Sequence, residues 1–289
     1  MDVSAVRPSR PGDEPALKGI WKAAFGDDDE FIDRFMAEVY TPGNASVAEM
    51  DEKVVSAIYL LTGTAMVMPD GKAFHAPYCY TLGTLPEYRG HGLGASVSEH
   101  IMRSAMSSAP MVALVPAEPS LYGWYADTFA LYPISELREA SFVVSELAER
   151  PEKARVHRVD NKSYVRLREL MLGGKCHIRF SSLLIGWYDH YIRAAGGGLY
   201  LLDIDGNAGC AACEIEDGHL SVKELLFPRG NFRNALSALA GEFKCSTMTV
   251  RSPVFFPSEG QTRDCAVARL AAGFSLPEKS SVWWGLAFD

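Results

Sequence analysis

Three glycines at alternate positions separate a strand-like run from a helical run. The strand-like run ends at Pro86, and apolar residues then recur every four positions from 93 to 105. Gly90, Gly92 and Gly94 lie where this helix must begin. Without a Cβ, they allow left-handed backbone and the close approach of a ligand. Since N–H groups at a helix N-terminus attract anions, the turn predicts a site for a pyrophosphate.

The spacing of this turn excludes two common phosphate-binding motifs. The chain has no GxxxxGK[ST] segment, and the glycines do not form GxGxxG. The spacing is Arg-x-x-Gly-x-Gly, with Arg89, Gly92 and Gly94 at the defined positions. Arg89 adds a positive charge at the same end of the helix.

Hydrophobic periodicity predicts a mixed α/β order in the first half of the chain. Helices are expected to begin after the N-cap candidates Asp13 and Asp28, within the glycine turn, and over 121–129. Strands are expected at 3–7, 45–50, 54–61, 74–85, 111–115, 131–136 and 140–144.

The second half is expected to repeat this order. The stretch 146–158 is polar and contains Pro151, which places a domain boundary near residue 150. Helices are expected at 161–172, 182–194, 231–242 and 262–271, and strands at 198–204, 209–215, 219–227, 247–251 and 281–288. We therefore predict two tandem α/β (α+β) domains, 1–149 and 150–289, which arose by duplication.

Charge and hydropathy exclude several partners. The 28 basic and 36 acidic side chains give a net charge of −8, with no clustered Lys and Arg to bind nucleic acid. The longest apolar stretch, 57–68, is shorter than the about 20 residues that span a membrane. The first 14 residues lack the apolar core of a signal peptide, so we expect a cytoplasmic protein with no membrane partner.

The cysteines predict no metal site. There are 6 cysteines, too few for a disulfide scaffold. Cys210 and Cys213 form a CxxC, but no second pair or nearby histidine completes a zinc set. We interpret them as small apolar strand residues.

The turn resembles the acetyl-coenzyme A signature of the GNAT superfamily of acetyltransferases, Q/R-x-x-G-x-G/A. Arg89, Gly92 and Gly94 match it, and the strand before, the helix after and the two earlier helices follow the order of that fold. The resemblance implies two tandem GNAT-like domains, each with a mixed, mostly antiparallel sheet flanked by helices.

The resemblance also implies a binding mode for acetyl-CoA as cosubstrate. The segment that would hold the pyrophosphate through its backbone amides is Arg89, Gly90, His91, Gly92, Leu93, Gly94 and Ala95. The strand residues that would pair with the pantetheine arm are Leu82, Gly83 and Thr84. A strand N–H there would polarise the thioester carbonyl.

A second match lies downstream. Members of the family often carry a helix of the form LYxxYxKxGF, whose second tyrosine protonates the departing thiolate. Residues 121–130 fit this form and place Tyr125 at the acid position, although Phe129-Ala130 replaces Gly-Phe. Tyr122 and simple core packing of Tyr125 are the alternatives.

The sequence does not identify the general base. His75, Tyr80 and the acidic run 28–30 are all candidates to face an amine. His91 is expected at the surface beside the phosphate rather than in proton transfer.

The second half departs from the motif. Arg229 could take the role of Arg89, but Phe232 and Asn234 occupy the two glycine positions. Near its Gly-Phe pair, Arg269 stands at the acid position. The C-terminal domain therefore looks like a degenerate copy.

These observations predict an acetyl-CoA-dependent N-acetyltransferase that acts without a metal on a primary amine of a small molecule or peptide. The alternative is a coenzyme A-binding regulatory or scaffold protein without turnover. A longer acyl group or a hydroxyl acceptor stays open, as does the oligomeric state.

Overall fold

The computed structural model describes residues 3–288, with side chains from Ala5 onward. The chain forms two compact units that alternate along the sequence. Unit 1 comprises the chain up to Ala65, Phe74–Tyr132 and Val267–Ser275, and unit 2 comprises Met66–Ala73, Pro133–Ala266 and the chain from Leu276. A domain boundary near residue 150 remains a prediction.

Unit 1 is a seven-stranded sheet with helices on both faces. The strands follow the order β1-β2-β3-β6-β7-β17-β8. Its elements are β1 (Val3–Pro8), α1 (Glu14–Phe25), α2 (Asp29–Glu38), β2 (Ala45–Met50), β3 (Lys53–Leu61), β6 (Tyr78–Thr84), η1 (Pro86–Tyr88), α3 (Leu93–Met106), β7 (Met111–Leu114), α4 (Leu121–Phe129), β8 (Tyr132–Pro133) and β17 (Val267–Leu270).

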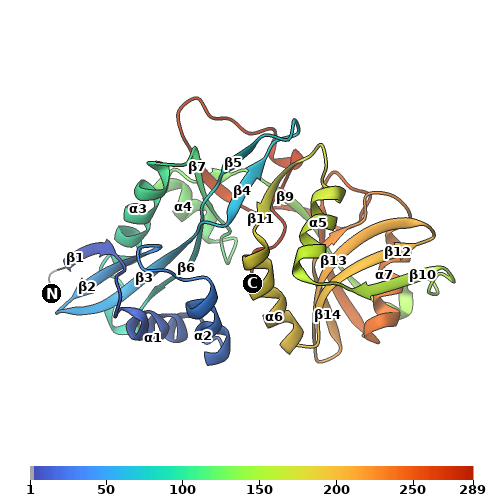
Figure 1. Ribbon diagram of the computed structural model, residues 1–289, viewed down its shortest axis with the longest axis horizontal. Helices are drawn as coiled ribbons and strands as arrows, with labels where there is room; N and C mark the ends of the chain where they lie inside the picture. Colours follow the sequence, from blue (N-terminus) through green and yellow to red (C-terminus); the bar gives the residue numbers. More distant parts are fainter. Residues whose placement is uncertain (1–2, 289) are drawn as a thin grey trace. The chain divides into compact units, whose positions relative to one another are not determined.

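Helices α1 and α3 cover opposite faces of this sheet (Figure 1). On one face, α1 lies so close to β6 that a Cβ on Gly83 would come 2.9 Å from Ile20 Cγ2. The Trp21 ring of α1 packs 4.8 Å from Phe35 and 5.3 Å from Tyr59, measured between ring centroids. This aromatic cluster packs α1 and α2 against the sheet beside β6, the strand that leads into the glycine turn.

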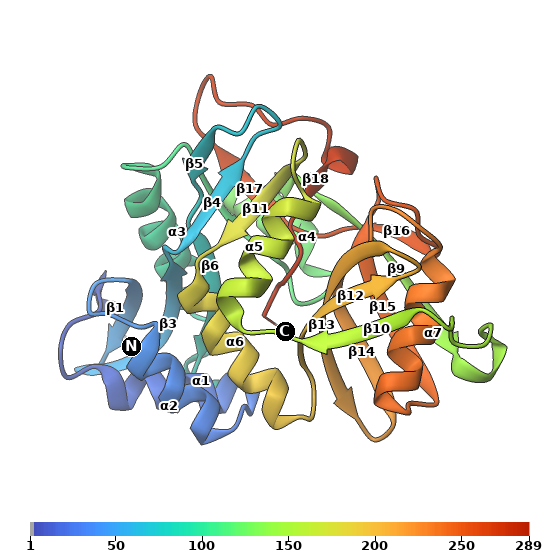
Figure 2. The same ribbon diagram turned by 45° about the vertical axis from the view of Figure 1, so that its right-hand side comes forward.

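Unit 2 contains a second seven-stranded sheet, in which α5 and α6 cover one face and α7 the other (Figure 2). The strand order is β10-β12-β13-β14-β15-β9-β16. The elements are β9 (Glu136–Val143), η2 (Val144–Glu146), β10 (Ala154–Arg158), α5 (Asn161–Met171), α6 (Ser182–Ala194), β12 (Gly198–Ile204), β13 (Asn207–Glu216), β14 (His219–Leu226), α7 (Phe232–Phe243), β15 (Thr247–Pro253) and β16 (Gln261–Asp264).

The two sheets have the same order, position for position, with one reciprocal exchange. β9 follows unit 1 in the sequence but pairs antiparallel with β15. β17 follows unit 2 in the sequence but pairs antiparallel with β7. The repeated order supports a duplication, and the exchange means that each sheet takes its sixth strand from the other half of the chain.

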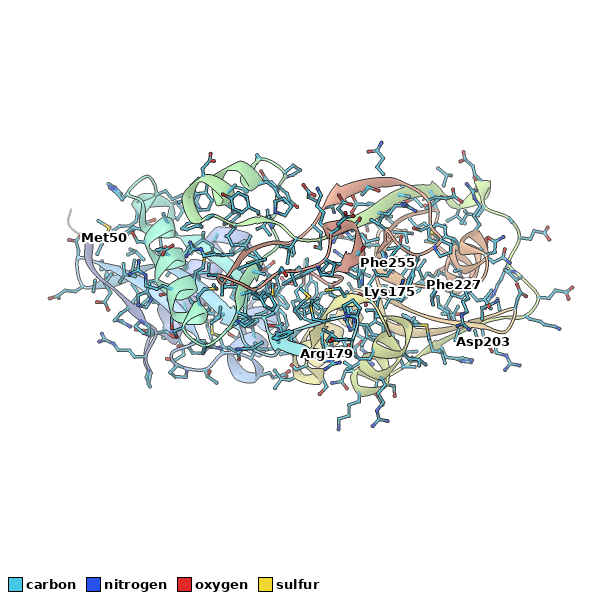
Figure 3. The ribbon with its side chains drawn as sticks, turned by 90° about the horizontal axis from the view of Figure 1, so that it is seen from above. Met50, Lys175, Arg179, Asp203, Phe227 and Phe255 are labelled. Atoms are coloured by element: carbon cyan, nitrogen blue, oxygen red, sulfur yellow. The ribbon has the colours of Figure 1, made fainter. Side chains whose placement is uncertain are left out.

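A third, four-stranded sheet has the order β18-β11-β4-β5. Its strands are β4 (Thr64–Val67), β5 (Ala73–His75), β11 (Cys176–Phe180) and β18 (Val282–Trp283), with η3 (Lys279–Ser281) before β18. The residue before β11, Lys175, places its Nζ 5.3 Å from the ring centroid of Phe255, and both side chains are labelled in Figure 3. The sequence patterns predicted neither β4 nor β11.

Three of the expected elements were wrong. The helix expected at 262–271 is two strands, β16 and β17, because pairing with other strands outweighs the helix propensity of its alanines. The strand expected at 281–288 is only Val282–Trp283. The strand expected at 74–85 breaks before Tyr78, where Pro77 has no N–H to donate to a ladder.

A buried ion pair holds the centre of unit 2. Glu224 on β14 is 0% exposed and accepts hydrogen bonds from Arg168 Nε at 3.0 Å and Tyr164 Oη at 2.8 Å. Trp283 Nε1 donates to the same carboxylate at 2.7 Å. Arg168 also donates to the carbonyl oxygen of Trp284 at 3.1 Å. Every charged atom in the cluster therefore has a partner, as burial requires.

Removal of one partner should be costly. We expect Arg168→Met to lower the free energy of unfolding by about 3–5 kcal/mol, because Glu224 would keep a buried and uncompensated charge. Urea titration of the whole chain measures the change. Arg179→Met is the control: its ion pair with Glu169 is partly exposed and should contribute at most about 1 kcal/mol. Equal effects for the two variants would contradict this account.

Candidate functional site

The parallel strands β6 and β7 part soon after they meet. Their recorded register pair is Tyr78 with Ala113, next to a hydrogen bond from Ala113 N to Pro77 O of 3.0 Å. In unit 2, the corresponding pair β14 and β15 stays in register from His219–Thr247 to Val222–Val250. Gly83 and Thr84 of β6 pair with β3, whereas Thr81 and Leu82 lie in a bulge of that ladder. Over residues 3–288, none of these four residues has a ladder partner on the β7 side. An extended ligand could therefore pair with this edge.

A bulge turns the backbone of β6 where the edge opens. The register with β3 shifts between Ala57–Gly83 and Tyr59–Tyr80. Thr81 has a φ of +44°, which is strained for a β-branched residue. Its Oγ1 atom is buried and has no hydrogen-bond partner in the described chain. Strain and an unsatisfied hydroxyl at one residue are typical of a ligand site.

The glycine turn leaves a row of N–H groups unused. Gly90 and Gly92 have φ values of +81° and +74°, and Gly92 is the N-cap of α3. Within the part of the chain that the structure describes, the N–H groups of Gly90, His91 and Gly92 donate no recorded hydrogen bond. The first turn of α3 adds further free donors. Arg89 is exposed, and its Nε donates to the carbonyl of Thr84 at 3.1 Å.

Strand β6 and the turn form one continuous surface. A Cβ on Gly94 would lie 3.8 Å from both Cδ atoms of Leu82 and from Thr84 Oγ1, which is ordinary contact. Internal packing therefore does not require a glycine at 94. Ala95 begins a hollow of about 470 Å³ that runs along α3 to Phe129 at the end of α4. The predicted residues 82–84 and 89–95 are thus brought together.

Tyr125 lies on α4 with its ring buried, at 8% exposure. Its hydroxyl has no recorded hydrogen bond to the described residues, and Trp124 and Phe129 pack 4.8 Å and 6.2 Å from its ring centroid. Burial, and then the nearby Cys79 thiol, raise the pKa of Tyr125 to about 12. The alternative Tyr122 is half-buried, one turn earlier.

Sequence reasoning missed Cys79. It lies at the start of β6, buried at 4% exposure, and burial raises its thiol pKa to about 12. The thiol is therefore protonated near neutral pH and is a small apolar neighbour of Tyr125, not a nucleophile. Tyr80 points toward Trp21. Because side chains alternate along a strand, Cys79 points to the opposite face of the sheet. This alternation is the sequence signal from which the position of Cys79 could have been predicted.

The candidate bases lie in different surroundings. His75 is exposed and bonded through Nε2 to the carbonyl of Thr62 at 3.1 Å. Tyr80 packs against the rings of Trp21 and Phe35, at 5.8 Å and 6.2 Å. The acidic residues 28–30 are exposed at the start of α2. His91 is also exposed, as expected.

The corresponding turn in unit 2 is closed to an anion. The N-cap of α7 is Asn231, whose Oδ1 accepts from the N–H groups of Arg233 at 2.9 Å and Asn234 at 3.4 Å. Phe232 is buried at 7% exposure. Where β6 has Gly83 after its bulge, β14 has the buried Glu224. The donors that stay free in α3 are satisfied in α7 by a side chain.

Comparison with known families identifies the first part of the chain. Residues 5–126 match the model for the acetyltransferase (GNAT) domain. Residues 5–126 form a GNAT acetyltransferase domain. At the level of the family, the activity is acyl transfer, and the resemblance expected from the glycine turn is confirmed.

Solved structures share the GNAT fold over most of the chain. A probable N-acyltransferase from Enterococcus faecalis V583 has a TM-score of 0.68 at 13% identity, covering 92% of this chain and 72% of that chain. A GCN5-related N-acetyltransferase from Kribbella flavida has a TM-score of 0.62 at 18% identity, with coverage of 92% and 72%. Eis1 from Mycobacterium abscessus has a TM-score of 0.64 at 11% identity, with coverage of 92% and 73%. No curated protein gives a significant match.

Membrane spans and metal clusters are both absent from the described residues. Among residues 3–288, no helix has the length and apolar character needed to cross a membrane. The same residues contain no group of three or more His, Cys, Asp or Glu side chains placed to hold a metal ion.

The raised pKa predicts an unusual titration. An exposed tyrosine ionises near pH 10, whereas Tyr125 of the GNAT domain should stay protonated through pH 11. The difference in tyrosinate absorbance between the wild type and Tyr125→Phe should therefore be absent at pH 10–11. Tyr132→Phe, which removes a tyrosine that is 60% exposed, is the matched control. A tyrosinate signal from Tyr125 at pH 10 would contradict the buried environment.

Proposed function

We propose that this chain is an acetyl-CoA-dependent N-acetyltransferase that moves an acetyl group onto a primary amine of a small molecule or peptide. One observation carries the proposal: the open edge of β6 leads directly into the free N–H groups at the start of α3. Extended polar backbone followed by an anion site fits a pantetheine arm followed by a pyrophosphate. Thr81, whose buried hydroxyl has no partner among the described residues, directly precedes the strand residues that would meet that arm.

The chain's own residues supply binding and orientation. Backbone groups of Leu82, Gly83 and Thr84 would pair with the pantetheine amides, and the N–H groups of the segment 89–95 would hold the pyrophosphate. A strand N–H near the bulge would donate to the thioester oxygen and stabilise the negative charge that develops there. Catalysis would then depend mainly on how the amine and the thioester are placed.

Tyr125 would act as the general acid. The amine nitrogen attacks the carbonyl carbon, the carbon–sulfur bond breaks, and the Tyr125 hydroxyl gives its proton to the departing sulfur. The ammonium proton of the acceptor leaves to solvent or to a base, and a proton from solvent restores the Tyr125 hydroxyl. A phenol with a pKa of about 12 remains protonated at neutral pH, ready for this step.

Unit 2 would not bind acetyl-CoA. The Asn231 side chain satisfies the N-terminus of α7, and the Glu224 carboxylate with its partners fills the position after the bulge of β14. These features support the interpretation of the second half as a degenerate copy of the GNAT domain.

Turnover is tested with Tyr125→Phe. We expect kcat to fall by about 10²–10⁴ while the Kd for acetyl-CoA changes little, because the variant loses only a proton donor. Release of free coenzyme A, with polyamines, amino acids, aminoglycosides and peptides as acceptors, measures kcat, and calorimetry measures Kd. Tyr132→Phe is the matched control, since Tyr132 is 60% exposed, and it should behave as wild type.

The outcomes separate the two candidate functions. A large effect of Tyr122→Phe without an effect of Tyr125→Phe would move the acid to Tyr122. A wild type that binds coenzyme A but consumes no acetyl-CoA with any amine would overturn the enzyme and support a regulatory or scaffold protein.

The pyrophosphate position is tested with Gly94→Leu. The new Cβ makes only ordinary internal contacts. The rest of the side chain would occupy the approach to the α3 N-terminus, so the Kd for acetyl-CoA should rise at least about tenfold. Gly19→Leu is the control, because Gly19 is also helical and a Cβ there meets nothing within 4 Å. Calorimetry gives Kd, and the Tm checks the fold. Equal affinities in the two variants would show that the pyrophosphate does not bind there.

A further inference from the structure

One arginine joins the two helices that carry the proposed site. Arg269 lies on β17, in register with Val112 of β7. Its Nε donates to the carbonyl oxygen of Phe129 at 2.7 Å. Its Nη2 donates to Glu99 Oε2 at 2.9 Å, and its Nη1 lies 3.5 Å from Glu99 Oε1. A planar guanidinium that makes bonds in two directions fixes the distance between its acceptors.

The two acceptors belong to the two ends of the site. Phe129 is the last residue of α4, one turn after Tyr125, and its carbonyl oxygen has no partner within the helix. Glu99 lies on α3, in the turn after Gly94. Both residues also line the hollow that begins at Ala95. The bridge therefore connects the helix of the proposed acid to the helix of the proposed pyrophosphate turn.

Burial and charge favour the contact between Arg269 and Glu99. The hydrogen bond from Arg269 is the main cause that lowers the pKa of Glu99. Burial raises the pKa of Cys79, the thiol beside Tyr125, and the positive charge of Arg269 partly opposes that rise. Arg269 is only 23% exposed, whereas Arg103, the other cation near Glu99, is 79% exposed at 3.5 Å. The Arg103 pair has the geometry of a weak surface contact.

We propose that Arg269 is a positioning residue for acyl transfer, which holds α4 against α3 so that the Tyr125 hydroxyl meets the sulfur of the bound thioester. The inference rests on the proposed function of this site. It assigns to the GNAT domain a residue that lies far outside the segment 5–126 that matches the family. Arg269 touches no reacting atom, and its effect passes through the end of α4.

The test compares Arg269→Met with the control Arg103→Met in the whole chain. A displacement of about 1 Å at a reacting group can cost about 10²-fold in rate, so Arg269→Met should lower kcat by about 10- to 100-fold. The Kd for acetyl-CoA should change less than about threefold, because Arg269 makes no contact with the loop donors. Arg103→Met should leave both values as in the wild type.

The pH profile separates positioning from a general loss of structure. A looser α4 admits water to Tyr125, so its pKa falls from about 12 toward the ordinary value near 10. In the plot of kcat against pH, the fall in rate at alkaline pH should therefore begin at a lower pH in Arg269→Met than in the wild type. Arg269→Lys keeps the charge but carries all its donors on one nitrogen instead of a planar fork, so it should recover only part of kcat. Glu99→Ala removes the α3 end of the bridge and should show a smaller loss of the same kind, which keeps the test valid if Arg269→Met does not fold.

Each result decides the inference. A reduced kcat with an unchanged Kd, a shifted alkaline limb and partial recovery by Lys support it. Wild-type kcat in Arg269→Met or in Glu99→Ala, or full recovery by Lys, overturns it while the proposed function stands. A wild-type chain that acetylates no amine overturns both.

Discussion

The separation of β6 from β7 is the constraint on which the proposed site depends. Parallel strands in a sheet normally satisfy each other's backbone groups, but here the recorded pairing stops at Tyr78. The exposed edge would be unfavourable unless something else bonded to it. The bulge at Thr81 lies on this edge, and the N-cap of α3 at Gly92 follows β6 along the chain. In unit 2, the same region is filled by Glu224 and its donors.

Local signals in the sequence predicted the helices that carry the proposed site. The glycine turn predicted that a helix starts within 90–94, and α3 begins at Leu93. The helix expected at 121–129 is α4, Leu121–Phe129. Both depend on contacts between residues near in sequence, and the family comparison confirms the resemblance inferred from them. The difference between Gly92 and Asn231 as N-caps could also be read from the sequence, because a capping side chain and its absence are chemical facts of single residues.

Contacts between distant residues could not be predicted in this way. The alanine-rich run around Val267 has the pattern of a helix, yet it pairs with Met111–Leu114 as a strand. Arg269 faces Glu99 and Phe129 only because of that pairing. Cys79 and Tyr125 are far apart in the sequence and come close only in the folded chain. No spacing rule links such positions, since tertiary pairing decides them and overrides local propensity.

The exchange of β9 and β17 has a consequence for synthesis on the ribosome. Domains commonly fold in order as they emerge, at about 5–20 residues per second. Here β7 receives its neighbour β17 only after the whole of unit 2's main segment, Pro133–Ala266, has been translated. Unit 1 must therefore wait on the order of ten seconds with an open strand edge. During that interval the nascent chain needs protection from edge-to-edge association, and neither half reaches its final sheet much before the other.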